Sequence, residues 1–180
     1  MKSKFLILIF FIATLYSCNV SNTSSIAIDK NDIIGTWTIQ NITLNNATLN
    51  VTSPIVTKLT GSGFGKNFNT SINFSENPNK VIMNGNFIFE LTYKAPSGVL
   101  ATEELLFDNI FFNDNFGFTS SSWQLNDNVL KLNEGDETLN IDVISFVNNV
   151  LTMETAVNKS ITLSGITSTV VGKASIQIRK

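Results

Sequence analysis

Histidine is absent from the 180-residue chain, and cysteine occurs only once. Without histidine the chain cannot form a Ser-His-Asp triad or a Cys-His dyad, and a single thiol excludes an internal disulfide and a thiolate zinc site. Most familiar enzyme chemistry is therefore excluded, and we expect neither catalysis nor a cofactor or metal centre. Twelve lysines and arginines against 14 acidic residues leave no basic stripe, so nucleic acid is not an expected partner.

Charged residues make up only 14% of the chain, whereas apolar residues make up 43%. This balance supports a hydrophobic core and is not typical of a disordered chain. Removing an export segment of 17 residues leaves 180 − 17 = 163 residues, which is the size of one domain.

The chain begins with the layout of a signal peptide. Lys2 and Lys4 precede an apolar stretch at residues 5–16. This stretch is about 12 residues long, short of the roughly 20 that a transmembrane helix needs. We therefore expect residues 1–17 to be a cleaved leader.

The only cysteine follows this leader directly. Leu15-Tyr16-Ser17-Cys18 resembles the lipobox of bacterial lipoproteins, in which the thiol is acylated before cleavage. The resemblance implies an acylated, for instance palmitate-bearing, Cys18 that anchors the protein to a membrane of the bacterial envelope, the outer membrane on its periplasmic or surface side. The alternative is a secreted protein with an incidental cysteine. The Ser-, Thr- and Asn-rich composition at residues 18–32 predicts a flexible tether, with the domain at 33–180.

Past residue 32 the apolar residues recur with a period of two, and no stretch has a helical period. Asn126-Asp127-Asn128 and Asn148-Asn149 separate such runs and predict hairpin turns. The expected strands are 33–44, 55–59, 68–74, 81–93, 105–112, 117–125, 129–132, 139–146, 150–157, 161–163 and 174–179. The pattern predicts an all-β fold, an up-and-down antiparallel β-barrel of about eight to ten strands or a β-sandwich.

Gly35-Thr36-Trp37 at the start of the first expected strand resembles the Gly-x-Trp signature of lipocalins and the wider calycin group. The resemblance implies that Arg179, on the last strand, packs against Trp37 and closes one end of the barrel. A guanidinium can lie flat on an indole while donating to carbonyls, which makes such a plug physically reasonable.

The segment at 122–132, followed by strands at 139 and 150, resembles the second half of the lipocalin-like lipoproteins of Bacteroidota envelopes. The resemblance implies an exported barrel on a lipid tether and carries over no catalytic residue.

Aromatic residues concentrate in the middle of the chain. They predict the wall of a pocket for a small hydrophobic ligand, with residues 96–104 as a lid, or the filling of a closed core. The candidate pocket residues are Phe87, Phe89, Tyr93, Phe107, Phe111, Phe118 and Trp123.

Glu103, Glu104 and Asp108 form the densest acidic set, which we interpret as a solvated rim. Residues 133–137 are interpreted as a hairpin turn, and the glycines at 61–65 as a bulge or loop.

Three functions remain open at this stage. The first is a non-catalytic binding barrel for a small apolar ligand. The second is a filled-core module that contacts another envelope protein through its loops. The least favoured is a hydrolase that uses Asp or Glu alone.

Overall fold

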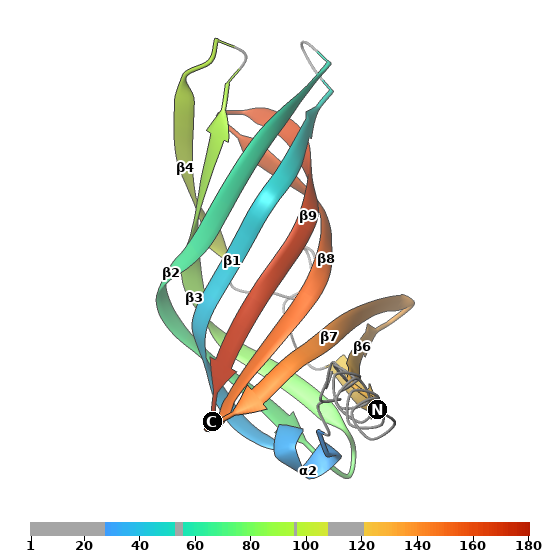
Figure 1. Cartoon of the computed structure of the whole chain (residues 1–180). Helices are drawn as coiled ribbons and strands as arrows, with labels where there is room; N and C mark the ends of the chain where they lie inside the picture. Colours follow the sequence, from blue (N-terminus) through green and yellow to red (C-terminus); the bar gives the residue numbers. More distant parts are fainter. Residues whose placement is uncertain (1–27, 53–55, 96, 108–120) are drawn as a thin grey trace, which may run out of the picture.

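The computed structural model describes residues 28–52, 56–95, 97–107 and 121–180. In these ranges, one four-residue helix precedes nine antiparallel strands (Figure 1). The elements are α2 (Lys30–Ile33), β1 (Gly35–Val51), β2 (Thr57–Ser75), β3 (Lys80–Lys94), β4 (Leu100–Phe107), β5 (Ser121–Asn126), β6 (Val129–Glu134), β7 (Glu137–Val147), β8 (Val150–Leu163) and β9 (Ile166–Arg179).

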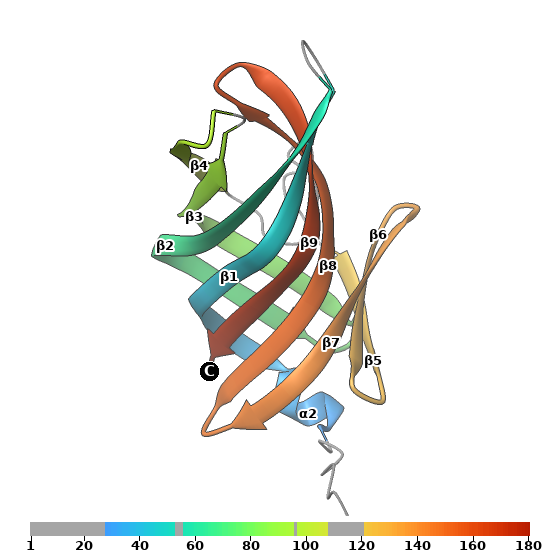
Figure 2. The same cartoon turned by 45° about the horizontal axis from the view of Figure 1, so that its top comes forward.

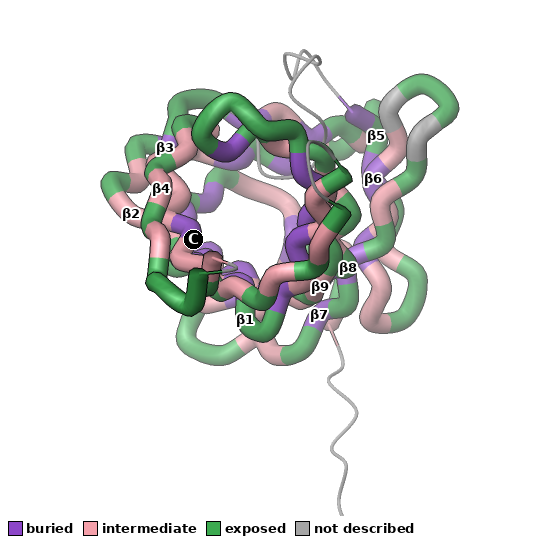
Figure 3. Tube along the Cα trace, turned by 90° about the horizontal axis from the view of Figure 1, so that it is seen from above, coloured by how far each residue is buried: buried purple, intermediate pink, exposed green. Residues whose placement is uncertain are grey.

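The nine strands form one sheet that closes on itself, and viewed from above the trace is a ring (Figure 3). Strand β1 pairs with β2 and with the last strand, β9. Strand β3 pairs with β2 over almost its whole length, with β5 near its start and with β4 over its second half. The predicted all-β up-and-down barrel is confirmed, and the β-sandwich alternative is wrong.

The strands are longer and fewer than the sequence predicted. The expected strands at 55–59 and 68–74 are two parts of β2, and those at 150–157 and 161–163 are two parts of β8. Strand β9 begins at Ile166, well before the predicted start at 174. Each merger has the same cause, because a polar or glycine-rich stretch that the sequence analysis left outside the expected strands continues the ladder.

Bulges interrupt the longest strands and give them their curvature. The pairing of β1 shifts register between Leu44 and Ala47, and that of β2 shifts between Lys66 and Asn69. An asparagine with positive φ lies in each bulge, Asn46 at 52° and Asn67 at 54°. Asparagine tolerates this conformation better than most residues, so these bulges follow from the local sequence.

The predicted hairpin turns are confirmed. Asn126 pairs with Val129 across the first turn, and Val147 pairs with Val150 across the second. Asn148 and Asn149 both have positive φ, as a two-residue type I′ turn requires. Residues 133–137 also contain the expected turn between β6 and β7.

A short helix packs under one end of the barrel, which we call the closed end (Figures 1 and 2). Its cap is a reciprocal pair of hydrogen bonds between Asp29 and Asp32, and Ile28 packs against the core. Residues 28–33, at the end of the predicted tether and the start of the predicted domain, thus pack at the closed end of the barrel. The Asp-x-x-Asp capping pair was the sequence signal for this helix.

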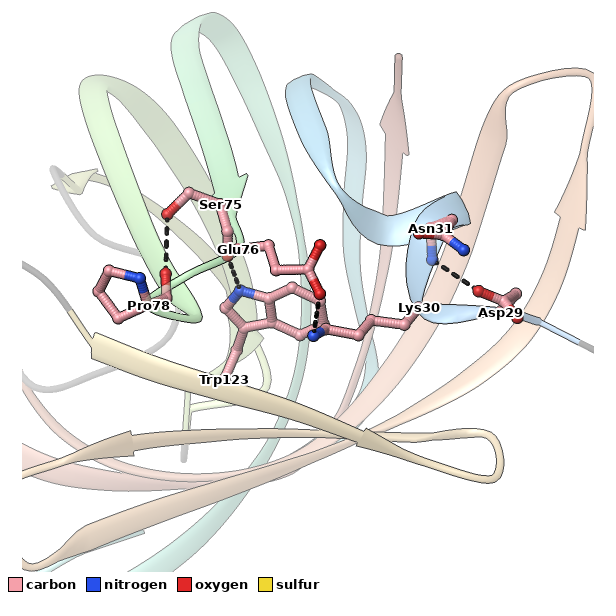
Figure 4. A network of polar contacts seen from close by, with 7 residues as sticks. All are labelled: Asp29, Lys30, Asn31, Ser75, Glu76, Pro78 and Trp123. Carbon is pink, nitrogen blue, oxygen red and sulfur yellow. Dashed lines mark hydrogen bonds and ion pairs between the residues drawn. The ribbon is translucent and has the colours of Figure 1, made fainter.

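Both tryptophans are fully buried at the closed end. The Trp37 indole nitrogen donates to the Ile33 carbonyl at 2.7 Å, and that of Trp123 donates to the Ser75 carbonyl at 2.9 Å. Lys30 reaches from α2 past the Trp123 ring, 5.8 Å from its centroid, to an ion pair with Glu76 (Figure 4). Each buried N–H is therefore satisfied, and the end of the barrel is sealed.

Buried apolar side chains form two clusters along the barrel. The larger fills the lower half, next to the closed end, and contains both tryptophans. The smaller lies in the upper half and is built on Leu44, Leu49, Leu91 and Leu163.

Candidate functional site

Among the residues that the structure describes, the backbone ladder is interrupted in the upper half of the barrel. Within the described residues, β7 pairs with β8 only as far as Glu154, and β4 pairs only with β3. The β6–β7 hairpin leans away from the barrel axis in both views, while β8 continues upward (Figures 1 and 2). We call the space between β4 and residues 155–163 of β8 the seam.

Among the described residues, no backbone ladder joins the two edges of the seam, but side-chain contacts do. The Glu103 carboxylate on β4 accepts hydrogen bonds from the Ser164 backbone N–H at 3.0 Å and from the Ser164 hydroxyl at 2.6 Å. It also accepts one from the Tyr93 hydroxyl at 3.0 Å. Glu103 therefore ties the β4 edge to the turn between β8 and β9.

A second contact crosses the seam lower down. The Lys159 ammonium on β8 lies 6.0 Å from the centroid of the Phe107 ring on β4. The two crossing contacts join Glu103 to Ser164 and Phe107 to Lys159, so the two edges run antiparallel. Leu105 and Ile161 lie between these contacts.

The inner wall beside the seam is only partly buried. Most inward side chains of the lower half are buried, as are those of β1 and β9 in the upper half. By contrast, apolar side chains that pack against the upper core from the strands near the seam keep part of their surface exposed. These half-buried residues are Phe89, Leu105, Val157 and Ile161. Apart from Leu59 on β2, the partly exposed aliphatic residues of the upper half therefore lie beside the seam.

Strand β2 makes room for this wall with glycines on its inner face. A Cβ atom on Gly63 would lie 2.4 Å from the Phe89 ring, and one on Gly61 would lie 2.9 Å from a Leu49 methyl carbon. Both glycines pair in the regular ladder with β3. The predicted bulge thus lies at Lys66–Asn69, and the glycines instead let an aromatic ring pack on the backbone.

The structure brings three of the predicted pocket residues together. The Phe107 ring stacks on that of Phe87 at 5.6 Å and meets that of Phe89 edge to face at 6.1 Å. Tyr93 lies higher on β3, whereas Trp123 packs against Phe74 in the lower core, away from the seam.

Several predicted positions lie outside the described residues. They are Cys18, Asp108, Phe111 and Phe118. The predicted lid at 96–104 is wrong from Leu100 onward, because this segment is strand β4.

Sequence reasoning missed Lys159, because Asn158-Lys159-Ser160 was interpreted as a break between two strands. The signal was present in the alternation of Val157, Lys159 and Ile161, which places all three on the same face.

Lys180, and not the predicted Arg179, lies against Trp37. Strand β9 alternates with Ile178 fully buried, so Arg179 points outward and is exposed. The Lys180 ammonium instead lies 5.3 Å from the Trp37 ring centroid and donates to the Asp32 carbonyl at 3.1 Å. Gly35 begins β1, with φ of 131° and the Lys180 side chain against it. A lysine thus covers each tryptophan at the closed end.

The two described residues of the predicted acidic set, Glu103 and Glu104, lie on opposite faces of β4. Alternation along β4 turns Glu103 toward the interior and Glu104 outward, where Glu104 forms an ion pair with Lys66. Among the described residues no group of three or more His, Cys, Asp and Glu could hold a metal ion. In the same part of the chain, no helix has the length and hydropathy to span a bilayer.

Burial raises the pKa of the Tyr93 phenol above its ordinary value, and the hydrogen bond to Glu103 and the carboxylate charge raise it further. In a chain that lacks residues 1–17, Tyr93 is the only tyrosine. We therefore expect ultraviolet titration of tyrosinate to give a midpoint above about 10. Glu103→Gln lowers that midpoint without restoring the ordinary value, because burial remains.

The effect of pH on stability follows from the raised pKa of Tyr93. The phenol is held neutral in the folded state, so its contribution to stability is complete below about pH 10 and is lost as the pH rises through the folded pKa. A midpoint that does not move in Glu103→Gln would show that Glu103 does not contact Tyr93 in solution.

Fold and site together define a class. Over the described residues the chain is an antiparallel barrel of nine strands, sealed at one end, with a partly exposed apolar wall at the other end beside a break in the described ladder. No family model, curated protein or solved structure matches this chain.

Proposed function

We propose that the chain is a lipid-anchored envelope barrel of the lipocalin-like type, with a non-catalytic role in binding a small apolar molecule in its upper half. One observation carries the proposal: the lower core contains 18 buried apolar residues, including both tryptophans, whereas the apolar side chains beside the seam keep part of their surface exposed. Apolar surface on a concave wall with few polar groups is typical of ligand sites.

The sealed end supports the same function. Because tryptophan indoles, α2 and two lysines close the lower half, a ligand enters from the upper hairpins or through the seam. Glu103 provides the polar closure at the upper hairpins, with all three of its hydrogen bonds inside the protein.

The point at which the described chain begins fits attachment through an acylated Cys18. Ile28 packs against the core and directly precedes α2 at the closed end, and a segment as long as residues 18–28 can span at most about 40 Å. The closed end is then held near the bilayer, and the upper hairpins point away from it.

Two neighbouring leucines on β4 give a matched test. Leu105 is half-buried and packs against the upper core, whereas Leu106 is 74% exposed. Protein purified from its own cells without denaturant is weighed by native and by denaturing mass spectrometry. We expect a small-molecule adduct on the wild type and on Leu106→Trp, lost on denaturation, and none on Leu105→Trp, because the indole occupies the ligand's space.

Bare protein masses for the wild type and both variants would contradict a resident ligand. A protein that copurifies at fixed stoichiometry would instead support the second candidate, an interaction module. One observation favours that candidate: exposed aliphatic residues lie at the ends of the hairpins that Figure 1 draws at the top. They are Val56, Val99, Leu100 and Ile166.

A further inference from the structure

Three upper hairpins lie at the end of the barrel opposite the closed end (Figures 1 and 2). They join β1 to β2, β3 to β4 and β8 to β9. Each carries at least one exposed aliphatic residue, and these are Val56, Val99, Leu100 and Ile166. Exposed apolar residues gathered at one end of a molecule are typical of a surface that meets another surface. The described residues of the upper hairpins are 50–52, 56–60, 92–95, 97–102 and 161–168.

The upper hairpins carry positive charge, whereas the whole chain has a formal charge of −2. Among their described residues the only charged side chains are Lys58 and Lys94, and both are exposed. Neither forms an ion pair with another described residue. The next residue of β4, Glu103, turns inward and accepts hydrogen bonds from Tyr93 and Ser164. Even with Glu103 counted, this end of the barrel keeps one net positive charge.

The residue types of the upper hairpins suit a lipid surface better than a protein partner. Protein interfaces concentrate aromatic and arginine side chains in a packed centre and are poor in lysine. The only aromatic residue in the described part of the upper hairpins is Tyr93, which is half-buried and donates to Glu103, and the one arginine of the chain lies on the last strand, near the closed end. A lysine beside an apolar tip can lay its stem along apolar surface while its ammonium stays among polar groups.

We propose that the upper hairpins dock on the surface of a lipid bilayer that contains anionic lipids. The aliphatic tips enter the headgroup region, and Lys58 and Lys94 pair with the headgroup phosphates. The docked bilayer then lies at the opposite end of the barrel from the proposed Cys18 anchor. This docking surface goes beyond the proposed ligand binding, because it uses exposed residues outside the wall beside the seam.

The test measures how much of the chain floats with lipid vesicles in a density gradient. Residues 18–180 are used with Cys18→Ser, which keeps every described residue and removes the expected leader and the acylation site. One set of vesicles is pure phosphatidylcholine, and the other contains about one-third phosphatidylglycerol. We expect about tenfold or tighter binding to the anionic set, because each lysine near an anionic surface contributes roughly fivefold. Raising the salt concentration removes this preference.

Two exposed leucines on β4 isolate the contribution of the apolar tips. Leu100 is 70% exposed at the end of its hairpin, whereas Leu106 is 74% exposed about 20 Å farther along the strand. We expect Leu100→Ser to lower the affinity for anionic vesicles by about tenfold, because this side chain leaves water on docking. Leu106→Ser is the matched control and leaves the affinity unchanged.

Two exposed lysines on β3 isolate the contribution of charge in the same way. Lys80 is the first residue of the strand, at the closed end, and Lys94 is the last, at the upper end. We expect Lys94→Gln to weaken binding to anionic vesicles by about fivefold and to leave binding to neutral vesicles unchanged. Lys80→Gln changes neither.

Circular dichroism first shows that each variant is folded. A folded chain that floats with neither set of vesicles overturns the docking surface, and so do equal losses for Leu100→Ser and Leu106→Ser. Binding that depends on neither phosphatidylglycerol nor Lys94 overturns the preference for anionic lipid. An envelope protein held at fixed stoichiometry through Leu100, without flotation, assigns the upper hairpins to a protein partner instead. The mass-spectrometric ligand test uses no vesicles, so ligand binding and docking fail separately.

Discussion

Gly85→Ala is expected to destabilise the barrel by roughly 3–5 kcal/mol, the sum of a strained backbone and an overpacked contact. Gly85 has φ of 93°, and a Cβ atom built on it would lie 1.8 Å from the Asn69 carbonyl oxygen. This obstacle is backbone, which cannot rotate away as a side chain can. Strands β2 and β3 would have to separate just beside the β2 bulge.

Gly135→Ala is the matched control for this variant. Gly135 also has a positive φ, 56°, but no atom lies within 4 Å of a Cβ built there. Gly135→Ala is therefore expected to lower the free energy of unfolding by about 1 kcal/mol, through the unfavourable backbone conformation alone. Urea unfolding of both variants measures the difference, and equal stabilities would show that β2 and β3 do not approach so closely in solution.

Trp123→Ala is expected to cost about 3–5 kcal/mol, the range for deleting a large buried aromatic side chain. The indole is fully buried, meets the Phe74 ring edge to face at 5.7 Å and satisfies the Ser75 carbonyl. Its loss leaves a cavity between β5 and the β2–β3 turn. It also removes the aromatic ring over which the Lys30 ammonium of α2 lies.

Phe64→Ala serves as the control, because Phe64 also lies on a strand but is 45% exposed. We expect that variant to lose less than about 1 kcal/mol. Urea or thermal unfolding compares the two. Similar losses for both would mean that the closed end is not the tightly packed part of the molecule.

The sequence predicted the barrel but not the length of its strands. Period-two alternation identified the strand regions correctly, because each strand presents one face to a core. Within β2, however, the bulge at Asn67 shifts the inward positions from odd to even residues, from Gly63 to Phe68 and Thr70. A pattern that changes phase in the middle of a strand looks like two strands and a turn.

The site was predicted less completely than the fold. Aromatic composition correctly indicated that Phe87, Phe89 and Phe107 gather, since large rings on one face of adjacent strands meet across the pair. The alignment of β4 with β8 depends on side-chain contacts between residues more than 50 positions apart in the sequence. One of them joins Glu103 to Ser164, in the turn that follows β8. No local pattern in the sequence encodes such a contact.

Both tryptophans of the chain lie in the lower half, and this decides what its intrinsic fluorescence can report. Indole emission follows the unfolding of the closed end, where both rings are shielded from water. A ligand bound beside the seam meets Phe and Tyr instead of Trp, so a titration followed by native emission is expected to stay flat even at saturation. Optical detection of binding therefore requires a dye-labelled ligand or a reporter introduced in the upper half.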